Sequence, residues 1–470
     1  MAPSTQSQSG EWVFITTSPA HRRPTKAQRS QMRQRVMREI GYARRKEHSK
    51  VSQSEASCVP TDASSTVLVR GPSAIESQPG SLNPPVPTVP APGSILSSVA
   101  WPVTLNTESQ WLLQHMFSDT TSNKFRIYRD RWYPLCMTHT AAFDQMLVTY
   151  ATHVSRDWPE HNLQHFIFAN HARALARVRN HLGSQQAREP QAFYGILSAI
   201  AALACYSHLI DDRPSWGLHM MATSRLIKES GLKPTELDKR VIDLAQWVDS
   251  IGSYAFDTAP VLGYLKTDDS HYNSAEPLPP CLRNLDLSVP LCLAVRALQW
   301  VNAQLSLRAF TIGTSIWRNP TEIDRLIYPL TYQLLSIRQN TGDIPPIYSC
   351  IRSAALLYLA EFRRKSGISP VLTCVHLRRL CNALNAIDQA SIKTELTLWL
   401  LTVGAMEAKH RADQHYFHTR LSQVLRALGI DSVLLWKLHL EAIVWFDCLF
   451  DMKLNMIWKV AQTHTGVNQP

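Results

Sequence analysis

The sequence has little glycine, no closely paired cysteines and no long apolar run near its start. Its 470 residues include 17 glycines, and no Gly-x-Gly-x-x-Gly or Gly-x-Ser-x-Gly motif occurs among them. Phosphate-binding loops and nucleophile elbows are therefore not indicated. The nine cysteines are scattered without a Cys-x-x-Cys pair, which predicts free thiols in a reducing compartment rather than disulfides or a thiolate metal site. The first residues lack the apolar core of a secretion signal.

Charged residues are missing between Glu189 and Asp211, where the chain is strongly apolar. This run is nearly long enough to span a bilayer. It also holds Tyr194, Ser198 and His208, and charges of both signs flank it. We therefore predict a helix buried inside a domain, and no membrane partner.

Acidic residues are scarce in residues 21–50, which contain eleven Lys/Arg and two glutamates. This segment carries a local charge of +9, out of +11 for the whole chain. If residues 29–46 form a helix, Met32, Val36 and Ile40 share one stripe and arginines surround it. Such a block is typical of an import signal or of a segment that binds a polyanion. The residues that we assign to nucleic-acid binding or nuclear import are Arg22, Arg23, Lys26, Arg29, Arg33, Arg35, Arg38, Arg44, Arg45 and Lys46.

Four interpretations of this basic arm stay open. The arm is a nuclear-localisation signal for an import receptor, or it contacts DNA, mainly through phosphates and therefore salt-sensitively. These two roles are compatible with each other. Alternatively, the arm folds on a protein partner or an acidic membrane, or it is only a solvated tail. Arginine outnumbers lysine in it, and the planar guanidinium suits phosphates and guanine edges.

Composition divides the chain into four segments. Residues 1–50 form the basic arm, and residues 51–106 form a Ser/Pro-rich linker that cannot bury a core. Residues 107–458 have helical patterns almost throughout and no internal repeat of fixed period, and residues 459–470 are expected to be a flexible tail. The predicted fold class is therefore all-α: a multi-helix bundle or array preceded by a disordered arm and linker.

Two predicted helices of this region depend on end signals. Ser369 is the expected N-cap of a helix with Pro370 in its first position. The apolar stripe of this helix includes two thiols expected in the core, and it comprises Cys374, Leu377, Cys381 and Leu384. A second helix is expected after Gly429, with Asp431 or Ser432 as its cap. It is apolar nearly all round and continues into the segment AIVWFDCLF, as a core helix would.

Residue types that carry catalysis or bind metals occur in incomplete sets. Glu407 and His410 would supply half of a carboxylate-bridged di-iron site, but no second Glu-x-x-His occurs. His161 and His165 lack the intervening glutamate of a zinc protease, and His171 is six residues further on. We expect these side chains at the surface or at the edge of the core. The sequence predicts no enzyme activity, no cofactor and no bound metal.

Tryptophans and one acidic pair have structural interpretations. Asp211 and Asp212 fit a turn ahead of a new helix cap. For tryptophans at helical positions, core packing is the default and a ligand pocket is the alternative. These tryptophans are Trp132, Trp216, Trp247, Trp399, Trp436 and Trp445.

Several segments of the helical region form a recognisable series. The first is RIYRDRWYPLCMTHTAAFDQMLVTYATH (126–153), with an arginine-aromatic turn, a Trp-x-Pro-Leu step and a small-residue helix. It is followed by HARALARVRNHLG, FYGILSAIAALACYSHL, SWGLHMMATSRLIKESGL with His219, and VIDLAQWVDSIGSYAF with Trp247 and Asp249. LTLWLLTVGAMEA and HLEAIVWFDCLF complete the series. In this order the segments resemble the fungal-specific transcription factor domain family, over roughly residues 107–455.

The N-terminus adds a second resemblance. VFITTSP followed by RSQMRQRVMREIGYARRK is similar to the head of family members that lack the N-terminal zinc binuclear cluster. That cluster needs six cysteines in two Cys-x2-Cys-x6-Cys halves, whereas Cys58 stands alone before Cys136. DNA reading by a zinc cluster is therefore not expected.

The resemblance implies a nuclear regulator of transcription that controls a metabolic or secondary-metabolite gene cluster in a fungus. Its expected partners are DNA through the arm, an import receptor, and other regulators or a second copy of the chain. The alternative is a helical adaptor that binds another transcription factor without contacting DNA. An enzyme with a helical active site is the third hypothesis, which stoichiometric iron or zinc in the purified protein would revive.

Overall fold

Helices are the regular elements of the described part of the chain, and no strand occurs in it. The computed structural model describes residues 100–118, 125–137, 139–182, 190–230, 236–263, 277–318, 320–337, 345–368, 370–387 and 392–463. The predicted all-α fold class is confirmed for these ranges. The basic arm of residues 1–50 lies outside them.

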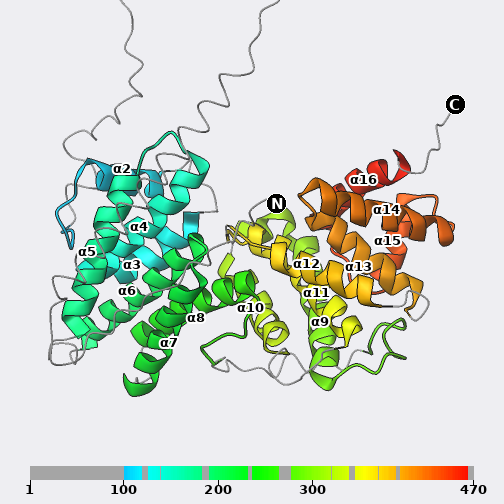
Figure 1. Cartoon of the computed structure of the whole chain (residues 1–470), viewed down its shortest axis with the longest axis horizontal. Coiled ribbons are helices and arrows are strands. Elements are labelled where there is room, and N and C mark those ends of the chain that lie inside the picture. The colour runs from blue at the N-terminus through cyan, green and yellow to red at the C-terminus, as the bar shows by residue number, and fades with distance from the viewer. Residues whose placement is uncertain are drawn as a thin grey trace, which may run out of the picture. The chain divides into compact units, whose positions relative to one another are not determined.

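The N-terminal half of the described chain contributes eight helical elements (Figure 1). The element η4 is a single π-helical turn and runs directly into α3. The elements are α2 (Thr107–Phe117), η4 (Tyr128–Trp132), α3 (Tyr133–Cys136), α4 (Thr140–Asp157), α5 (Gln164–Leu182), α6 (Pro190–Leu209), α7 (Arg213–Ser230) and α8 (Glu236–Phe256).

The C-terminal half contributes the remaining elements, which run from light green to red in Figure 1. The element η7 is a 3-10 helix that continues α9. The elements are α9 (Val289–Ile312), η7 (Gly313–Arg318), α10 (Pro320–Ser336), α11 (Pro346–Lys365), α12 (Cys374–Ala386), α13 (Thr394–Glu407), α14 (Arg411–Ala427), α15 (Val433–Glu441) and α16 (Asp447–Thr463).

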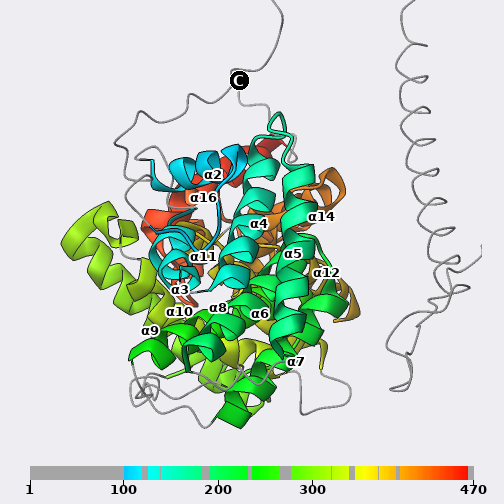
Figure 2. The same cartoon turned by 90° about the vertical axis from the view of Figure 1, so that its left-hand side faces the viewer.

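Helix α6 is the central helix of the first half. It contacts α4, α5, α7 and α8, and Figure 2 shows α4, α5 and α6 side by side. Its apolar window 192–209 is long enough to cross a membrane, but 83% of it is buried among the other helices. The buried helix predicted between Glu189 and Asp211 is therefore confirmed. Helix α6 carries apolar side chains on all its faces because each face meets another helix.

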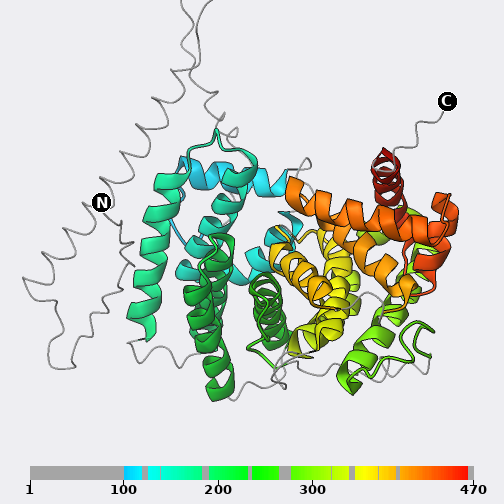
Figure 3. The same ribbon diagram turned by 45° about the vertical axis from the view of Figure 1, so that its right-hand side comes forward.

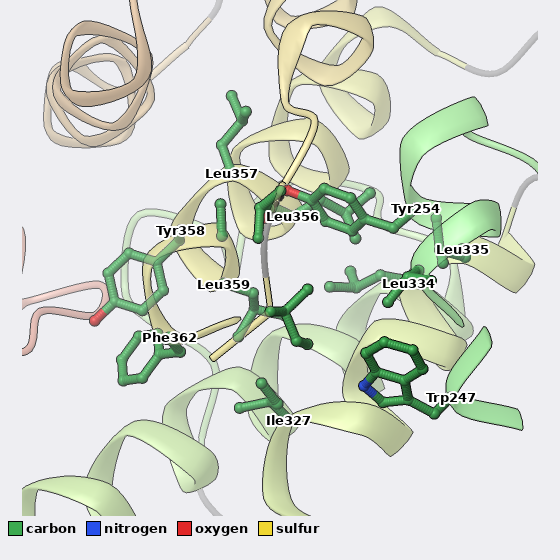
Figure 4. Packing of buried hydrophobic residues seen from close by; sticks show 14 of the residues in the cluster. Trp247, Tyr254, Ile327, Leu334, Leu335, Leu356, Leu357, Tyr358, Leu359 and Phe362 are labelled. Atoms are coloured by element: carbon green, nitrogen blue, oxygen red, sulfur yellow. Dashed lines mark hydrogen bonds between the residues drawn. The ribbon is translucent and has the colours of Figure 1, made fainter. Parts of the chain in front are cut away.

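Helix α11 has the same position in the second half, with contacts to α9, α10, α12 and α13. Figure 4 shows how its side chains meet those of α8 and α10. Leu356 and Leu359 pack in one cluster with Leu334 of α10 and with Tyr254 of α8. Tyr254 also donates its hydroxyl to the Leu356 carbonyl at 2.9 Å. Because α8 and α10 are in contact, one hydrophobic core extends through both halves.

The helix predicted from Pro370 begins later than expected. Its first residue is Cys374 and its N-cap is Thr373, while Pro370 lies in non-helical chain and Ser369 lies outside the described residues. The buried face centres on Leu377, Leu380 and Leu384, so the side chains at its edges turn outward. Of the two expected core thiols, Cys374 is exposed and Cys381 is half-buried. That expectation was wrong for Cys374.

The predicted core helix after Gly429 is divided into two. Ser432 caps α15 by accepting a hydrogen bond from the Leu435 amide at 3.3 Å, as expected. The helix ends at Glu441, and Ile443 to Phe446 follow as a non-helical segment whose four side chains are all buried. A helix would direct some of four consecutive side chains to the outside, so complete burial favours an irregular chain here. As a result α15 is buried on one face only, through Trp436 and Leu440.

Candidate functional site

The residues predicted to bind nucleic acid or an import receptor, from Arg22 to Lys46, lie outside the described part of the chain. Their role in binding therefore stays a prediction from the sequence. The candidate site that it does describe is internal. This site is a small cavity with buried polar groups around it.

The cavity lies between η4, α4, α6, α8 and the chain that follows α11. Its volume of about 10 Å³ gives room for about one water molecule. The side chains with polar atoms that line it are Tyr128, His153, Cys205, His208 and Trp247. They come from three segments of the series described above. The sequence elements that carry the resemblance therefore converge on one place.

The π-helical turn η4 positions the first of these side chains. It turns Tyr128 and Trp132 inward, and both are buried. Arg131 of the same turn reaches α10, where its Nη2 lies 3.1 Å from Asp324 Oδ2. Tyr128 Oη lies 3.4 Å from His153 Nδ1 of α4. Such π-turns often occur at functional sites, and Tyr128 of this turn lines the cavity.

Three titratable groups of the cavity, Tyr128, Cys205 and His208, are neutral near pH 7. Burial, followed by the charges of Arg156 and Arg363, lowers the pKa of His208 to about 3. Burial raises the pKa of the Cys205 thiol to about 12, so this cysteine is a poor nucleophile. Within the described chain, His208 Nδ1 and Trp247 Nε1 have no hydrogen-bond partner. The cavity therefore offers neutral hydrogen-bonding groups to one molecule of the size of water.

A buried ion-pair network lies where α8 ends. Asp257 accepts from Arg352 Nη2 of α11 at 2.7 Å and also pairs with Arg379 of α12. Burial alone would raise the pKa of Asp257, but Arg352, His376 and Arg379 outweigh it and hold this pKa below its usual value. His376 Nε2 lies 2.8 Å from the Tyr254 carbonyl. The network joins α8, α11 and α12.

Arg363 of α11 is a buried cation with unusual surroundings. Its Nη1 donates to Ser250 Oγ at 3.3 Å, and its guanidinium carbon lies 4.7 Å from the centre of the Tyr254 ring. Burial lowers its pKa, against the raising effects of Tyr254 and Asp324. The tyrosine face and the nearby carboxylate therefore stabilise a charge that has been taken out of water.

Glu407 was expected at the surface, but it is buried and belongs to a second network. Its carboxylate accepts two hydrogen bonds from Arg364 of α11, at 2.7 and 2.5 Å. Glu361 bonds both Arg364 and Lys453 of α16, each at 2.7 Å. The network therefore joins α11, α13 and α16. In the described residues no group of three or more His, Cys, Asp or Glu side chains is placed to hold a metal ion.

His161, His165 and His171 lie at the surface or at the edge of the core, as expected. His165 is exposed. The ring centre of His161 lies 4.5 Å from that of Trp111. His171 pairs its Nδ1 with Gln145 Oε1 at 2.9 Å.

The acidic pair lies in the predicted turn, and its second member is itself the cap of the next helix. Asp212 Oδ1 accepts from the Ser215 amide at 3.0 Å and so caps α7. Asp211 has a φ of 61° in the turn before it, a conformation that aspartate tolerates better than most residues.

The predicted core packing of the six tryptophans is confirmed. All six are buried: Trp132, Trp216, Trp247, Trp399, Trp436 and Trp445. Trp399 Nε1 donates to the Val444 carbonyl at 3.1 Å, and Trp436 Nε1 donates to Thr402 Oγ1 at 3.2 Å. Trp247 differs because it also lines the cavity.

The buried arginines were not identified from the sequence. A signal for Arg352 exists in IYSCIRSAALLYLA, because it is the only charged residue between Asp343 and Glu361. A cation in the middle of such a helix predicts a buried partner. The partner itself, Asp257, is 95 residues away in the chain, and periodicity gives no information at that distance.

A family model described as the fungal specific transcription factor domain matches residues 113–435. The chain belongs to this family. The match extends from α2 into α15 and so includes the cavity and the network around Asp257. The resemblance inferred from the sequence is confirmed, and with it a role in transcription regulation. No curated protein and no solved structure matches the chain.

Proposed function

We propose that this regulator acts in the nucleus and controls a metabolic or secondary-metabolite gene cluster. The observation that carries the proposal is the combination of the family domain at 113–435 with a local charge of +9 in residues 21–50. In this proposal residues 1–50 form an arm for nuclear import and DNA phosphates. Residues 51–106 link it to a helical regulatory domain at 107–458.

Two physical arguments support the role of the arm. Phosphate contacts need closely spaced cations, and one protein segment with nine excess positive charges supplies them without a folded scaffold. The other 440 residues share a net charge of +2, so long-range attraction of a polyanion depends mainly on the arm. The same cluster is what an import receptor recognises, so both roles use the same residues.

The second candidate function is that of an adaptor. Two observations favour it: Cys58 stands alone where a zinc cluster would need six cysteines, and α15 exposes Leu434 and Leu438 to solvent. Exposed leucines one helical turn apart are a common docking face for another protein's helix. In this case a partner would bring the protein to its genes.

Chromatin occupancy separates the two functions. The tagged full-length protein is compared with a variant that lacks residues 1–50 and carries an unrelated import signal. Promoter peaks that disappear with the arm support DNA contact by the arm, and peaks that survive support the adaptor. Absence of peaks from both proteins, despite nuclear entry, would contradict both functions. Transcript profiles of a deletion strain then test whether the affected genes form a biosynthetic cluster.

A further inference from the structure

Two side chains in the wall of the cavity carry a nitrogen atom that has no hydrogen-bond partner in the described chain. These atoms are Nδ1 of His208 on α6 and Nε1 of Trp247 on α8. The two residues are 2% and 8% exposed, so bulk water does not reach these atoms. A buried polar group without a partner is costly, and such groups in folded proteins are bonded to protein or to ordered water.

The indole of Trp247 determines the first property of the missing partner. An indole N–H donates a hydrogen bond and cannot accept one, so the partner must be an acceptor. The neighbouring ring of Trp132, with its centre 6.5 Å away, carries no such oxygen or nitrogen. Trp399 shows how a buried indole is satisfied by protein, since its Nε1 donates directly to the Val444 carbonyl at 3.1 Å.

The charge of the wall determines a second property. Among the described residues no carboxylate lines the cavity, so a cation would have no anionic ligand there. Burial, followed by Arg156 and Arg363, lowers the pKa of His208 to about 3, so near pH 7 its neutral ring offers an anion no positive charge. A neutral molecule that both accepts and donates hydrogen bonds fits this wall best.

The size of the cavity determines a third property. Its volume of about 10 Å³ holds about one water molecule, and an internal water needs two to four polar partners. His208 and Trp247 supply two of them. Tyr128 supplies a third, because a hydroxyl has one donor and two acceptor sites and its contact with His153 Nδ1 is 3.4 Å long.

The end of α11 supplies the wall of the cavity from the second half of the protein. Figure 3 shows the blue-to-green helices of the first half beside the light-green-to-red helices of the second half. The Gly367 and Ile368 amides donate to the Arg364 and Arg363 carbonyls, each at 3.0 Å, and Gly367 has a φ of 88°. This is the usual glycine ending of a helix. Backbone hydrogen bonds therefore fix the two residues that line the cavity on this side.

We propose that the cavity binds one internal water molecule as a structural ligand. The water accepts a hydrogen bond from Trp247 Nε1, bonds His208 Nδ1 and has the Tyr128 hydroxyl as its third partner. One molecule thereby joins α6, α8 and the π-helical turn η4. The site goes beyond the proposed function and does not depend on DNA binding by the arm.

Crystallography of the full-length chain tests the site. At a resolution that shows ordered water, the wild type should have an electron-density peak about 2.7–3.2 Å from both Trp247 Nε1 and His208 Nδ1. Trp247→Phe keeps an aromatic ring and removes the N–H, so its peak should be weaker or displaced. A wild-type cavity without the peak overturns the proposal. A Ser369 hydroxyl bonded to either nitrogen also overturns it, since Ser369 stands between two residues of the wall and lies outside the described residues.

Crystals soaked in sodium bromide separate water from an anion. Bromide scatters anomalously and water does not, so the water predicts no anomalous peak in the cavity. An anomalous peak there would identify an anion site and overturn the proposal.

A double-mutant cycle tests the bridge in solution. Trp247→Phe, His208→Leu and the double variant are unfolded in urea at pH 8, where the histidine is neutral in both states. The double variant should lose clearly less stability than the sum of the two single losses, because the first substitution already removes the bridging water. Additive losses would mean that the two side chains share no ligand, and would overturn the proposal.

The matched control of the cycle is Trp399→Phe combined with His208→Leu. Trp399 is 2% exposed, but its indole donates directly to a carbonyl. The two losses should therefore add. A control pair as strongly coupled as His208 with Trp247 would mean that the coupling arises without a shared water, and would overturn the bridge.

Discussion

Arg352 and Asp257 form an ion pair in the interior, with Nη2 and Oδ1 2.7 Å apart and side chains that are 4% and 0% exposed. Asp257 follows directly after α8 and has a φ of 48°, in the left-handed region that aspartate adopts more readily than most non-glycine residues. Arg352 also donates its Nε to the Leu334 carbonyl of α10 at 2.7 Å. One arginine of α11 therefore fixes the end of α8 and a carbonyl of α10.

Replacing Arg352 should be strongly destabilising. Arg352→Met keeps much of the side-chain volume but leaves the buried carboxylate of Asp257 with Arg379 as its remaining cationic partner. Removal of one partner from a buried pair costs about 3–5 kcal/mol of unfolding free energy. The measurement is the urea unfolding midpoint at pH 7. Arg225→Met is the control, since its pair with Glu229 is exposed, and it should leave the midpoint unchanged. Equal effects of the two substitutions would contradict the assigned role of Arg352.

Two helical glycines should respond in opposite directions to alanine. A Cβ at Gly252 of α8 would overlap the indole of Trp216, which is buried. At Gly217 of α7 nothing lies within 4 Å of the added atom. Gly252→Ala should cost about 1–3 kcal/mol through overpacking, and Gly217→Ala should gain about 1 kcal/mol through helix propensity. Thermal unfolding of the two variants beside the wild type measures the difference, and a stabilised Gly252→Ala protein would refute the close contact.

Two buried histidines act to destabilise the protein in mild acid. Burial, then Arg156 and Arg363, lowers the pKa of His208 to about 3. Burial lowers the pKa of His376 to about 4, although Asp257 acts to raise it. In the unfolded chain both rings take up a proton near pH 6.5. The contribution of these two histidines to the free energy of unfolding is therefore retained above pH 6.5 and falls toward pH 4, by about 1.4 kcal/mol per pH unit for each. Burial raises the pKa of Asp249 and of Asp324 to about 6, and these two carboxyls act in the opposite direction below pH 6, so the histidines are tested by substitution and not by the wild-type slope alone.

Urea unfolding at pH 7, 6 and 5 measures this slope. His208→Gln and His376→Gln should each reduce it, because glutamine binds no proton in either state. The control is His410→Gln, since His410 is an exposed residue ahead of α14. This variant should keep the slope of the wild type. If neither buried-histidine variant is flatter than the control, other groups carry the acid sensitivity.

The fold class was predictable because it depends on periodic local patterns. Helical stripes and end signals are contained in short windows of sequence, and Ser432 acts as a cap as expected. The predictions failed where tertiary packing overrides local pattern. The segment Ile443 to Phe446 is apolar enough for a core helix. As an irregular chain it buries all four side chains, and so more apolar surface than a helix would bury here.

The internal site was predictable only in part. Trp247 was singled out from the sequence, but its place beside His208 and Tyr128 depends on how three separate helical segments pack. Ion pairs between residues about 95 positions apart, such as Arg352 with Asp257, leave no periodic signal. The proposed function of the arginine-rich arm, in contrast, was predictable from the sequence, because it depends on charge composition alone.

The salt dependence of DNA affinity tests the arm most directly. Each arginine that neutralises one phosphate contributes about 0.9 to the slope of log K against log salt concentration. Single substitutions Arg29→Gln, Arg33→Gln, Arg35→Gln and Arg38→Gln of the full-length protein should each reduce this slope by about one. Fluorescence anisotropy with a labelled duplex between about 50 and 200 mM salt measures it.

The control for the arm is a cation of the helical domain with a similar degree of exposure. Arg225 of α7 has its side chain 78% exposed, and Arg225→Gln should leave the slope unchanged. A wild-type affinity that is independent of salt would exclude phosphate contact by the arm. An equal loss of slope from Arg225→Gln would mean that binding reflects overall charge. In either case the basic run would keep import as its role, and recruitment by a partner would become the route to the promoter.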